Sequence, residues 1–148
     1  WLLIHKTLRA LVRQARGRNR EPSAAIIDSQ SVKTAQGGVR GYDAGKKVTG
    51  RKRHILVDTE GFLLTVVVHS ADIQDRDGGK QLLRKARGTL PRLQRIWADA
   101  GYAGKLVQWT EQRCQWLLEI VRRTGKGFQV LPRRWVVERT FGWFSRYR

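Results

Sequence analysis

The sequence predicts an α/β domain in which a mixed β-sheet carries helices on its faces. Two short apolar runs, residues 24–28 and 95–99, each end in Asp, and such runs are typical of buried strands. Two further β-rich runs, residues 54–58 and 63–68, flank a turn-like spacer and predict an antiparallel hairpin. Segments with apolar residues at helical spacing follow the hairpin and supply the covering helices.

The composition indicates one basic domain. The chain has 148 residues, 41% of them apolar, which is enough for a single core. Thirty Lys and Arg against twelve Asp and Glu give a formal net charge of +18. So large an excess costs stability through self-repulsion unless a polyanion relieves it, and nucleic acid is therefore the expected partner. A merely basic protein without such a partner is the alternative.

Neither a membrane segment nor a disulfide is expected. The sequence has no apolar run of 18 residues or more and no secretory signal pattern, so we expect no membrane association and a cytoplasmic location. A single cysteine, Cys114, cannot form an internal disulfide, and no second Cys or spaced His pair accompanies it for a zinc site. We expect Cys114 in the core or on a helix surface.

The N-terminal segment predicts a helix and a linker. Apolar residues at helical spacing over residues 1–16 predict an amphipathic helix. They are Ile4, Leu8, Leu11 and Ala15. Gly and Pro within residues 17–23 predict a polar linker after it. The sequence opens on Trp1 rather than on an initiator Met, so we expect further sequence upstream.

The rest of the chain alternates strands and helices. A stretch rich in Gly, Lys and Arg over residues 35–50 predicts a mobile basic loop. Helical spacing predicts helices over residues 77–87, 105–112 and 133–147, and the run 116–121 predicts a last strand. The order is three strands, helix, strand, helix, strand, helix, which folds as one mixed sheet with helices on its faces.

Three of the twelve acidic residues stand out by position. Asp28 and Asp99 end apolar strands, and Glu138 lies in a helix between apolar positions. A carboxylate in buried surroundings calls for a metal ion, an Arg partner or a helix terminus. Taken singly, a capping or turn role is the better explanation of such an Asp. Asp58 also follows an apolar run and is the rival for a place beside the three, but it lies at the predicted hairpin turn.

The acids lie in three blocks: IDSQSVKT at residues 27–34, WADAGY at 97–102 and RWVVERTFGW at 134–143. In this order they resemble the acidic blocks of the DDE-type transposases of bacterial insertion sequences. GRKRHILVDT at 50–59 and ADIQDRDG at 71–78 resemble the intervening segments of that family. The resemblance covers nearly the whole chain and implies a ribonuclease-H-like fold, whose element order the prediction shares.

The resemblance assigns Asp28, Asp99 and Glu138 as the catalytic, metal-binding triad. Such phosphodiester chemistry uses two divalent ions about 4 Å apart. Mg²⁺ and Mn²⁺ prefer oxygen ligands, so two Mg²⁺ or Mn²⁺ ions per active site are expected. Water attacks first and the freed 3′-hydroxyl attacks target DNA afterwards, so no nucleophilic side chain is expected.

Arg134 stands four residues before Glu138, as an Arg does before the Glu of the family. Residues four apart are neighbours on a helix, so Arg134 is expected to orient a carboxylate or to grip a phosphate. The fuller family pattern has a Tyr three residues before that Arg and a Lys or Arg seven residues after the Glu. Leu131 and Ser145 stand at those places here, which is a departure from the pattern.

Basic residues are expected to hold DNA by neutralising phosphates. An NTPase phosphate loop is excluded over residues 45–52, because Arg51 and Lys52 stand where that motif has Lys and Ser or Thr. A solvated basic loop without contacts is the alternative. The expected DNA-binding residues are Lys33, Lys46, Lys47, Arg51, Lys52, Arg53, Arg134 and Arg139.

The remaining polar and aromatic residues are expected to be structural. The acids near residue 75 lack the Gly and Glu of a calcium loop, and they predict a helix cap. They are Asp72, Asp75 and Asp77. The three histidines share no motif. Three tryptophans in the acidic blocks are expected in the core, namely Trp97, Trp135 and Trp143.

The resemblance implies metal-dependent DNA cleavage and strand transfer in transposition. Residues 1–22 are then the remnant of a larger N-terminal region, and residues 23–148 are a DDE catalytic domain that is incomplete at its C-terminus. The implied partners are DNA, both the element ends and the target duplex, and a second copy in a homodimer on DNA, in the bacterial cytoplasm and on the nucleoid. Two alternatives stay open: an inactive remnant that still binds DNA, and a host nuclease of the same fold.

Overall fold

The structure is a computed structural model that describes residues 1–34, 37–122 and 134–146. Within these ranges no helix is long and apolar enough to cross a membrane. The elements are α1 (Leu2–Ala15), β1 (Ala24–Lys33), β2 (Gly41–Asp43), β3 (Val48–Asp58), β4 (Leu63–Ser70), α2 (Asp75–Ala86), β5 (Arg95–Ala98), the 3-10 helix η1 (Ala100–Tyr102), α3 (Lys105–Cys114), β6 (Leu117–Ile120) and α4 (Trp135–Arg146).

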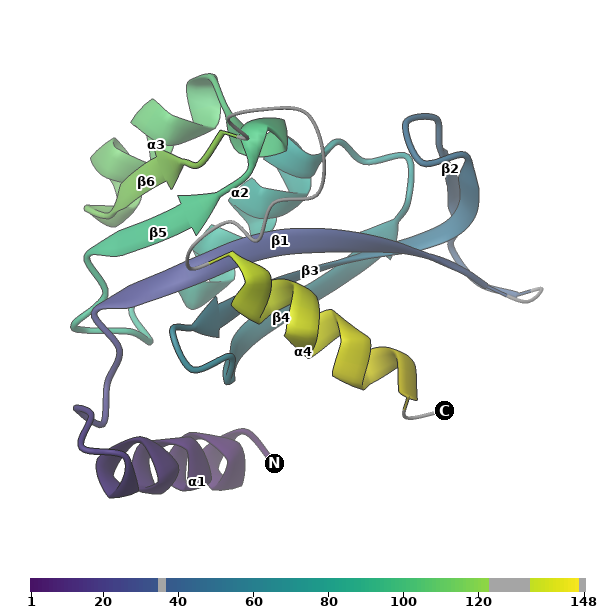
Figure 1. Cartoon of the computed structure of the whole chain (residues 1–148). Coiled ribbons are helices and arrows are strands. Elements are labelled where there is room, and N and C mark those ends of the chain that lie inside the picture. The colour runs from purple at the N-terminus through teal and green to yellow at the C-terminus, as the bar shows by residue number, and fades with distance from the viewer. Residues whose placement is uncertain (35–36, 123–133, 147–148) are drawn as a thin grey trace.

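In the described part of the chain, six strands form one mixed sheet (Figure 1). Central β1 pairs antiparallel with β3 on one side and parallel with β5 on the other. β6 continues parallel beyond β5, while β4 and β2 pair antiparallel with β3. The predicted mixed sheet with flanking helices is confirmed, and its element order is that of the ribonuclease-H-like fold.

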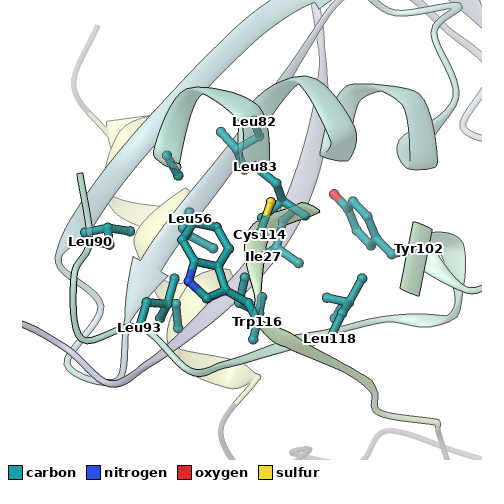
Figure 2. Close-up of a cluster of buried hydrophobic side chains, with 14 of the residues drawn as sticks. Ile27, Leu56, Leu82, Leu83, Leu90, Leu93, Tyr102, Cys114, Trp116 and Leu118 are labelled. Carbon is teal, nitrogen blue, oxygen red and sulfur yellow. The ribbon is translucent and has the colours of Figure 1, made fainter. Parts of the chain in front are cut away.

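Side chains alternate across the strands, and each face of the sheet carries its own core. α2 and α3 cover one face; Figure 2 shows Tyr102 at one side of that core and Leu90 and Leu93 at the other. α4 crosses the opposite face and packs over it (Figure 1). The core under α4 consists of Ile26, Ile55, Val57, Trp97, Val137 and Phe141.

The register between β1 and β5 places Asp28 and Asp99 at matching positions. Ile26 pairs with Trp97 in the parallel ladder. Asp28 and Asp99 each follow two residues later, so they lie side by side, Asp28 within β1 and Asp99 directly after β5. Because side chains alternate with a period of two, both acids belong to the face that α4 covers.

The basic stretch before the hairpin contains more strand than the sequence predicts. Residues 41–43 form β2, and β3 begins at Val48 instead of His54. Gly, Lys and Arg favour strands little, but pairing with β1 and β2 on both sides of β3 outweighs that preference. Lys52 therefore lies in a central strand, where the sequence predicts a loop.

The predicted N-terminal helix is confirmed as α1, but it packs against the rest of the protein with its basic side and not with its apolar side. Ile4, Leu8 and Leu11 are each more than half exposed. Arg13 is buried instead, and its Nη1 lies 2.5 Å from Oδ2 of Asp58. The helix docks through its cationic face because the hairpin turn offers a buried carboxylate to that face.

Asp58 is a turn residue and not a member of the acidic site. Its Oδ1 accepts hydrogen bonds from the backbone N–H groups of Glu60 and Phe62, each at 2.9 Å. Its Oδ2 is held by Arg13. Both oxygens are therefore engaged in joining the hairpin to α1.

Two of the three tryptophans expected in the core are at the surface. Trp97 is buried, as predicted, but Trp135 and Trp143 are 42% and 43% exposed. They lie on the outer side of α4, whose inner side is occupied by Val137 and Phe141. Cys114 is buried in the core beneath α2 and α3, as predicted.

The predicted acidic cap of α2 is only partly correct. The helix begins at Asp75, two residues before the predicted start, and Gln74 is its N-cap without a side-chain cap bond. Asp75 and Asp77 lie in the first turn, where negative charge is favourable. Asp72 instead accepts a hydrogen bond from Ser70.

Candidate active site

Asp28 and Asp99 face one buried cation. Arg134, just before α4, is 5% exposed. Its Nη2 lies 3.4 Å from Oδ2 of Asp28 and 3.8 Å from Oδ2 of Asp99. The two acids come from strands about seventy residues apart along the chain, so their convergence follows from the β1–β5 register.

Each acid is also fixed by a backbone N–H group. Oδ1 of Asp28 accepts from the N–H of Ser29 at 2.7 Å. Oδ1 of Asp99 accepts from the N–H of Gly101 at 2.9 Å, so that Asp99 caps η1. Each carboxylate thus has one oxygen held by the main chain and the other turned toward Arg134.

The charge of this pair is only partly neutralised. Burial raises the pKa of Asp28 to about 6, and the neighbouring Asp99 acts in the same direction. The Ser29 N–H, the Arg134 guanidinium and the more distant Lys46 oppose this rise. Two close carboxylates that share one guanidinium favour the arrival of a further cation.

Glu138 is not brought into this pair. It lies on α4 with an exposed side chain. Across residues 1–34, 37–122 and 134–146, no three His, Cys, Asp or Glu side chains are arranged so that they could hold a metal ion. Asp28 and Asp99 fit a hard divalent cation by donor type. In the structure, Arg134 takes the position between them.

Lys52 does not fit the predicted contact with DNA. Its side chain is buried, and Nζ lies 3.2 Å from Oδ2 of Asp43 and 3.0 Å from Oδ1 of Asp75. Nζ also donates to the carbonyl of Ile73 at 2.9 Å. Its three protons are therefore used inside the protein.

Other predicted DNA-binding residues remain near the surface. Lys33 and Lys47 are exposed, at the end of β1 and in the β2–β3 turn. Lys46 is exposed in the same turn, and its Nζ approaches the Ser29 carbonyl at 3.3 Å. Arg51 is half-buried and donates to the carbonyl of Val39. Lys46 thus reaches the residue next to Asp28.

Two predicted DNA-binding arginines are engaged with aromatic rings. Arg53 donates to Oε1 of Gln30 and lies over the rings of Phe141 and Phe144. The Arg139 guanidinium stacks between two exposed tryptophans on α4, 4.6 Å from the Trp135 ring centre and 4.8 Å from that of Trp143. α4 thus presents an outer ladder of Trp135, Arg139 and Trp143.

A cleft of about 570 Å³ lies beside Lys52 and Asp75. Its walls come from the β2–β3 turn, the start of α2 and Gly101 next to Asp99. Lys46 and Arg76 supply positive charge there, and Asp43 and Asp75 supply negative charge.

A polar cluster behind the acids was not predicted. We call it the backing cluster and define it as Ser29, Lys52, His54, Asp75 and Tyr102. Its members lie in the sequence blocks that carry the resemblance, directly after Asp28, close to Asp99 and in the two intervening segments. That placement was the available signal, but the pairing of the residues becomes visible only in the fold.

Comparison with known proteins identifies the family. The family model described as "Transposase DDE domain" matches residues 19–148. A piggyBac transposase synaptic complex with hairpin DNA shares 17% identity with a TM-score of 0.47, over 76% of this chain and 25% of that chain. A Mos1 transposase paired-end complex with the left transposon end shares 13% identity with a TM-score of 0.42, over 77% and 40%.

This chain spans less than half of either structure's chain. A comparison with curated proteins gives no match. The family model, in contrast, covers all of the described strands and the segments that hold Asp28, Asp99 and Glu138. The chain belongs to the transposase DDE domain family.

Proposed function

We propose that this chain is the catalytic part of a DNA transposase and that Asp28 and Asp99 form the centre of its active site. One observation carries the proposal: Asp28 within β1 and Asp99 directly after the adjacent parallel strand β5 face the same cation, Arg134. Membership of the family and a net charge of +18 support the same reaction class, which is strand cleavage and strand transfer.

We further propose that Asp28 and Asp99 hold Mg²⁺ or Mn²⁺; Glu138, which the family resemblance gives as the third ligand, would have to approach them from its exposed position on α4. Two such ions, about 4 Å apart, activate an attacking oxygen and stabilise a leaving one in phosphodiester chemistry. Asp28 and Asp99 would hold such a cation by their carboxylates. Arg134 would hold a phosphate, to which a guanidinium can donate two parallel hydrogen bonds.

Basic side chains around the acids are proposed to hold the DNA backbone. Lys33 at the end of β1, with Lys46 and Lys47 in the β2–β3 turn, supplies charge that neutralises phosphates. The proposed partners are the element ends and the target duplex, with a homodimer on DNA. The proposed place of action is the bacterial nucleoid.

The test compares Asp99→Asn with Asp77→Asn. Asp77 is an exposed acid in the first turn of α2 and serves as the matched control. We expect Mg²⁺ or Mn²⁺ to support nicking of DNA by the wild type and by Asp77→Asn, and Asp99→Asn to abolish it. DNA binding at fixed salt is expected to be equal in all three. Ca²⁺ is expected to support binding with little turnover.

Two results would count against the enzyme. Nicking by Asp99→Asn at the wild-type rate means that Asp99 is not in the active site. A wild type that binds DNA but does not nick it in either metal supports the inactive remnant instead. A preference for branched or hybrid substrates over plain duplex favours a host nuclease.

A further inference from the structure

We propose that Ser29 is a positioning residue, which fixes the Asp28 carboxylate by tying it to the backing cluster on the opposite face of the sheet. The inference rests on the proposed role of Asp28 and Asp99 as metal ligands. Ser29 itself touches no reacting group, and it acts through Asp28.

Ser29 connects the two faces of the sheet. Consecutive residues of a strand point to opposite faces, so Asp28 faces α4 while the Ser29 side chain faces α2. The Ser29 N–H donates to Oδ1 of Asp28 at 2.7 Å, and the Ser29 hydroxyl donates to Oδ1 of Asp75 at 3.0 Å. One residue therefore holds Asp28 through its main chain and the cluster through its side chain.

The first arm of the cluster is anchored by a buried cation. Asp75 shares the Lys52 ammonium with Asp43, at 3.0 and 3.2 Å. Burial alone raises the pKa of Asp75, but hydrogen bonding and charge from Lys52 outweigh it, so the pKa lies below its ordinary value and the acceptor stays ionised. A charged acceptor gives the Ser29 hydroxyl a stronger hydrogen bond than a neutral one.

The second arm runs through Tyr102. This side chain is fully buried, its hydroxyl lies 2.9 Å from Nδ1 of His54, and it also has a side-chain hydrogen bond with Ser29. Burial, together with neighbouring His69, lowers the pKa of His54 to about 3, so the ring is neutral at physiological pH. A neutral imidazole protonated at Nδ1 can donate to the tyrosine oxygen, which leaves the tyrosine proton for the Ser29 oxygen and the Ser29 proton for Asp75.

Both arms also reach Asp99. Tyr102 ends η1, the short helix that Asp99 caps. Asp75 lies beside the same turn: a Cβ placed on Gly101 would be 3.0 Å from Oδ1 of Asp99 and 3.3 Å from Oδ2 of Asp75. The cluster therefore holds the segments of both acids in one relative geometry. Supporting residues of this kind typically change metal affinity or activity by roughly 10- to 100-fold.

The chain provides a matched pair of variants, Ser29→Ala and Ser31→Ala. Ser31 lies on the same strand and the same face, and its hydroxyl donates to Oδ2 of Asp43 at 2.6 Å. Each substitution removes one hydroxyl from an aspartate that Lys52 also holds. Of the two serines, Ser29 is the one whose N–H donates to Asp28. A general loss of stability should therefore appear in both variants, whereas a loss of Asp28 positioning should appear only in Ser29→Ala.

The readouts are the affinity for Mn²⁺ without DNA and the hydrogen exchange of the residue 29 amide. Ser29→Ala is expected to weaken Mn²⁺ binding roughly tenfold, which is typical for loss of a residue that holds a metal ligand in place. It is also expected to speed exchange of that amide. Ser31→Ala is expected to stay within about twofold of the wild type in both. Equal values for the two variants overturn the proposal.

A second pair of variants tests the proposal if the serine variants do not fold. Tyr102→Phe removes only the hydroxyl that meets Ser29 and His54, and Thr110→Val removes another fully buried hydroxyl, which bonds within α3. Weaker Mn²⁺ binding by Tyr102→Phe alone supports the proposal, and equal loss in both contradicts it. If Asp28→Asn binds Mn²⁺ as the wild type does, the metal site itself is wrong, and exchange of the residue 29 amide still decides whether Ser29 positions Asp28.

Discussion

Burial of Asp28 in the metal-free fold disfavours the ionised form of its carboxyl group. Its pKa is raised by burial to about 6, above the ordinary value of 3.8. Between these two pH values the folded chain binds more protons than the unfolded chain, so the free energy of unfolding falls as pH rises. Above pH 6 the full cost of the ionised carboxylate is present.

Asp28→Asn is therefore expected to stabilise the metal-free chain at pH 8. We expect a gain of about 1–3 kcal/mol, since one pKa unit corresponds to about 1.4 kcal/mol and the lost contact with Arg134 offsets part of it. The gain should become small near pH 4, where the carboxyl is protonated in the folded state and about half protonated in the unfolded state. Urea unfolding in EDTA at both pH values measures it, and a variant less stable than the wild type at pH 8 contradicts the sign.

The buried ion pair of Arg13 and Asp58 is the main attachment of α1. Arg13→Ala leaves a buried carboxylate without its partner, and such a loss typically costs about 3–5 kcal/mol. Arg16→Ala, one turn later, removes an exposed pair with Glu60 and is expected to cost less than about 1 kcal/mol. Urea unfolding of the two variants should differ by several-fold in cost, and equal costs would contradict the assigned burial.

At the scale of elements, two glycines in helices should respond to alanine in opposite ways. A Cβ on Gly78 in α2 would overlap the buried rings of His54 and His69, whereas a Cβ on Gly142 in α4 meets nothing within 4 Å. Alanine favours helix over glycine by about 1 kcal/mol. Overpacking in a core costs about 1–3 kcal/mol.

Gly142→Ala is therefore expected to raise the melting temperature and Gly78→Ala to lower it. Differential scanning calorimetry of both variants against the wild type measures the two signs. A stabilising Gly78→Ala would show that the space between α2 and the histidines is larger than the structure has it.

The strands were predictable where the pattern is local. Apolar runs that end in Asp marked β1 and β5, and their parallel register then placed Asp28 beside Asp99. The packing of α1 was not predictable in this way. Periodicity shows which side of a helix is apolar, but the partner that buries Arg13 is Asp58, which is remote in sequence and becomes a neighbour only in the fold.

The role of Lys52 could not be predicted from the local sequence either, because its charge is paired with acids that are remote in sequence. Composition places it in a basic stretch, but a strand alternates its side chains, and position 52 falls on the face that also carries Asp43 and Asp75. Glu138 and Arg134 were predicted as neighbours in one helical block. The structure places Arg134 between the two aspartates, and it leaves Glu138 at the surface.

At the scale of the whole molecule, the excess of positive charge predicts salt-sensitive binding to DNA. Each phosphate neutralised on a duplex contributes a slope of roughly −0.9 to the plot of log affinity against log salt. Lys47→Gln in the exposed β2–β3 turn is expected to make the slope shallower by about that amount. Lys85→Gln is the control, because Lys85 lies in the last turn of α2 and donates to the Val66 carbonyl.

Fluorescence anisotropy across a salt series measures both slopes. If Lys47→Gln and Lys85→Gln change the slope equally, DNA does not prefer the β2–β3 turn. An affinity indifferent to salt would contradict nucleic-acid binding through phosphates altogether.

The tight turn between β3 and β4 is shared by the first and last helices. Arg16 of α1 pairs with the Glu60 side chain at 2.9 Å. From α4, Arg139 donates to the Glu60 carbonyl at 2.8 Å and Thr140 to the Gly61 carbonyl at 3.0 Å. The β3–β4 turn therefore joins α1 to α4, and α4 follows directly on Arg134, which faces the two aspartates.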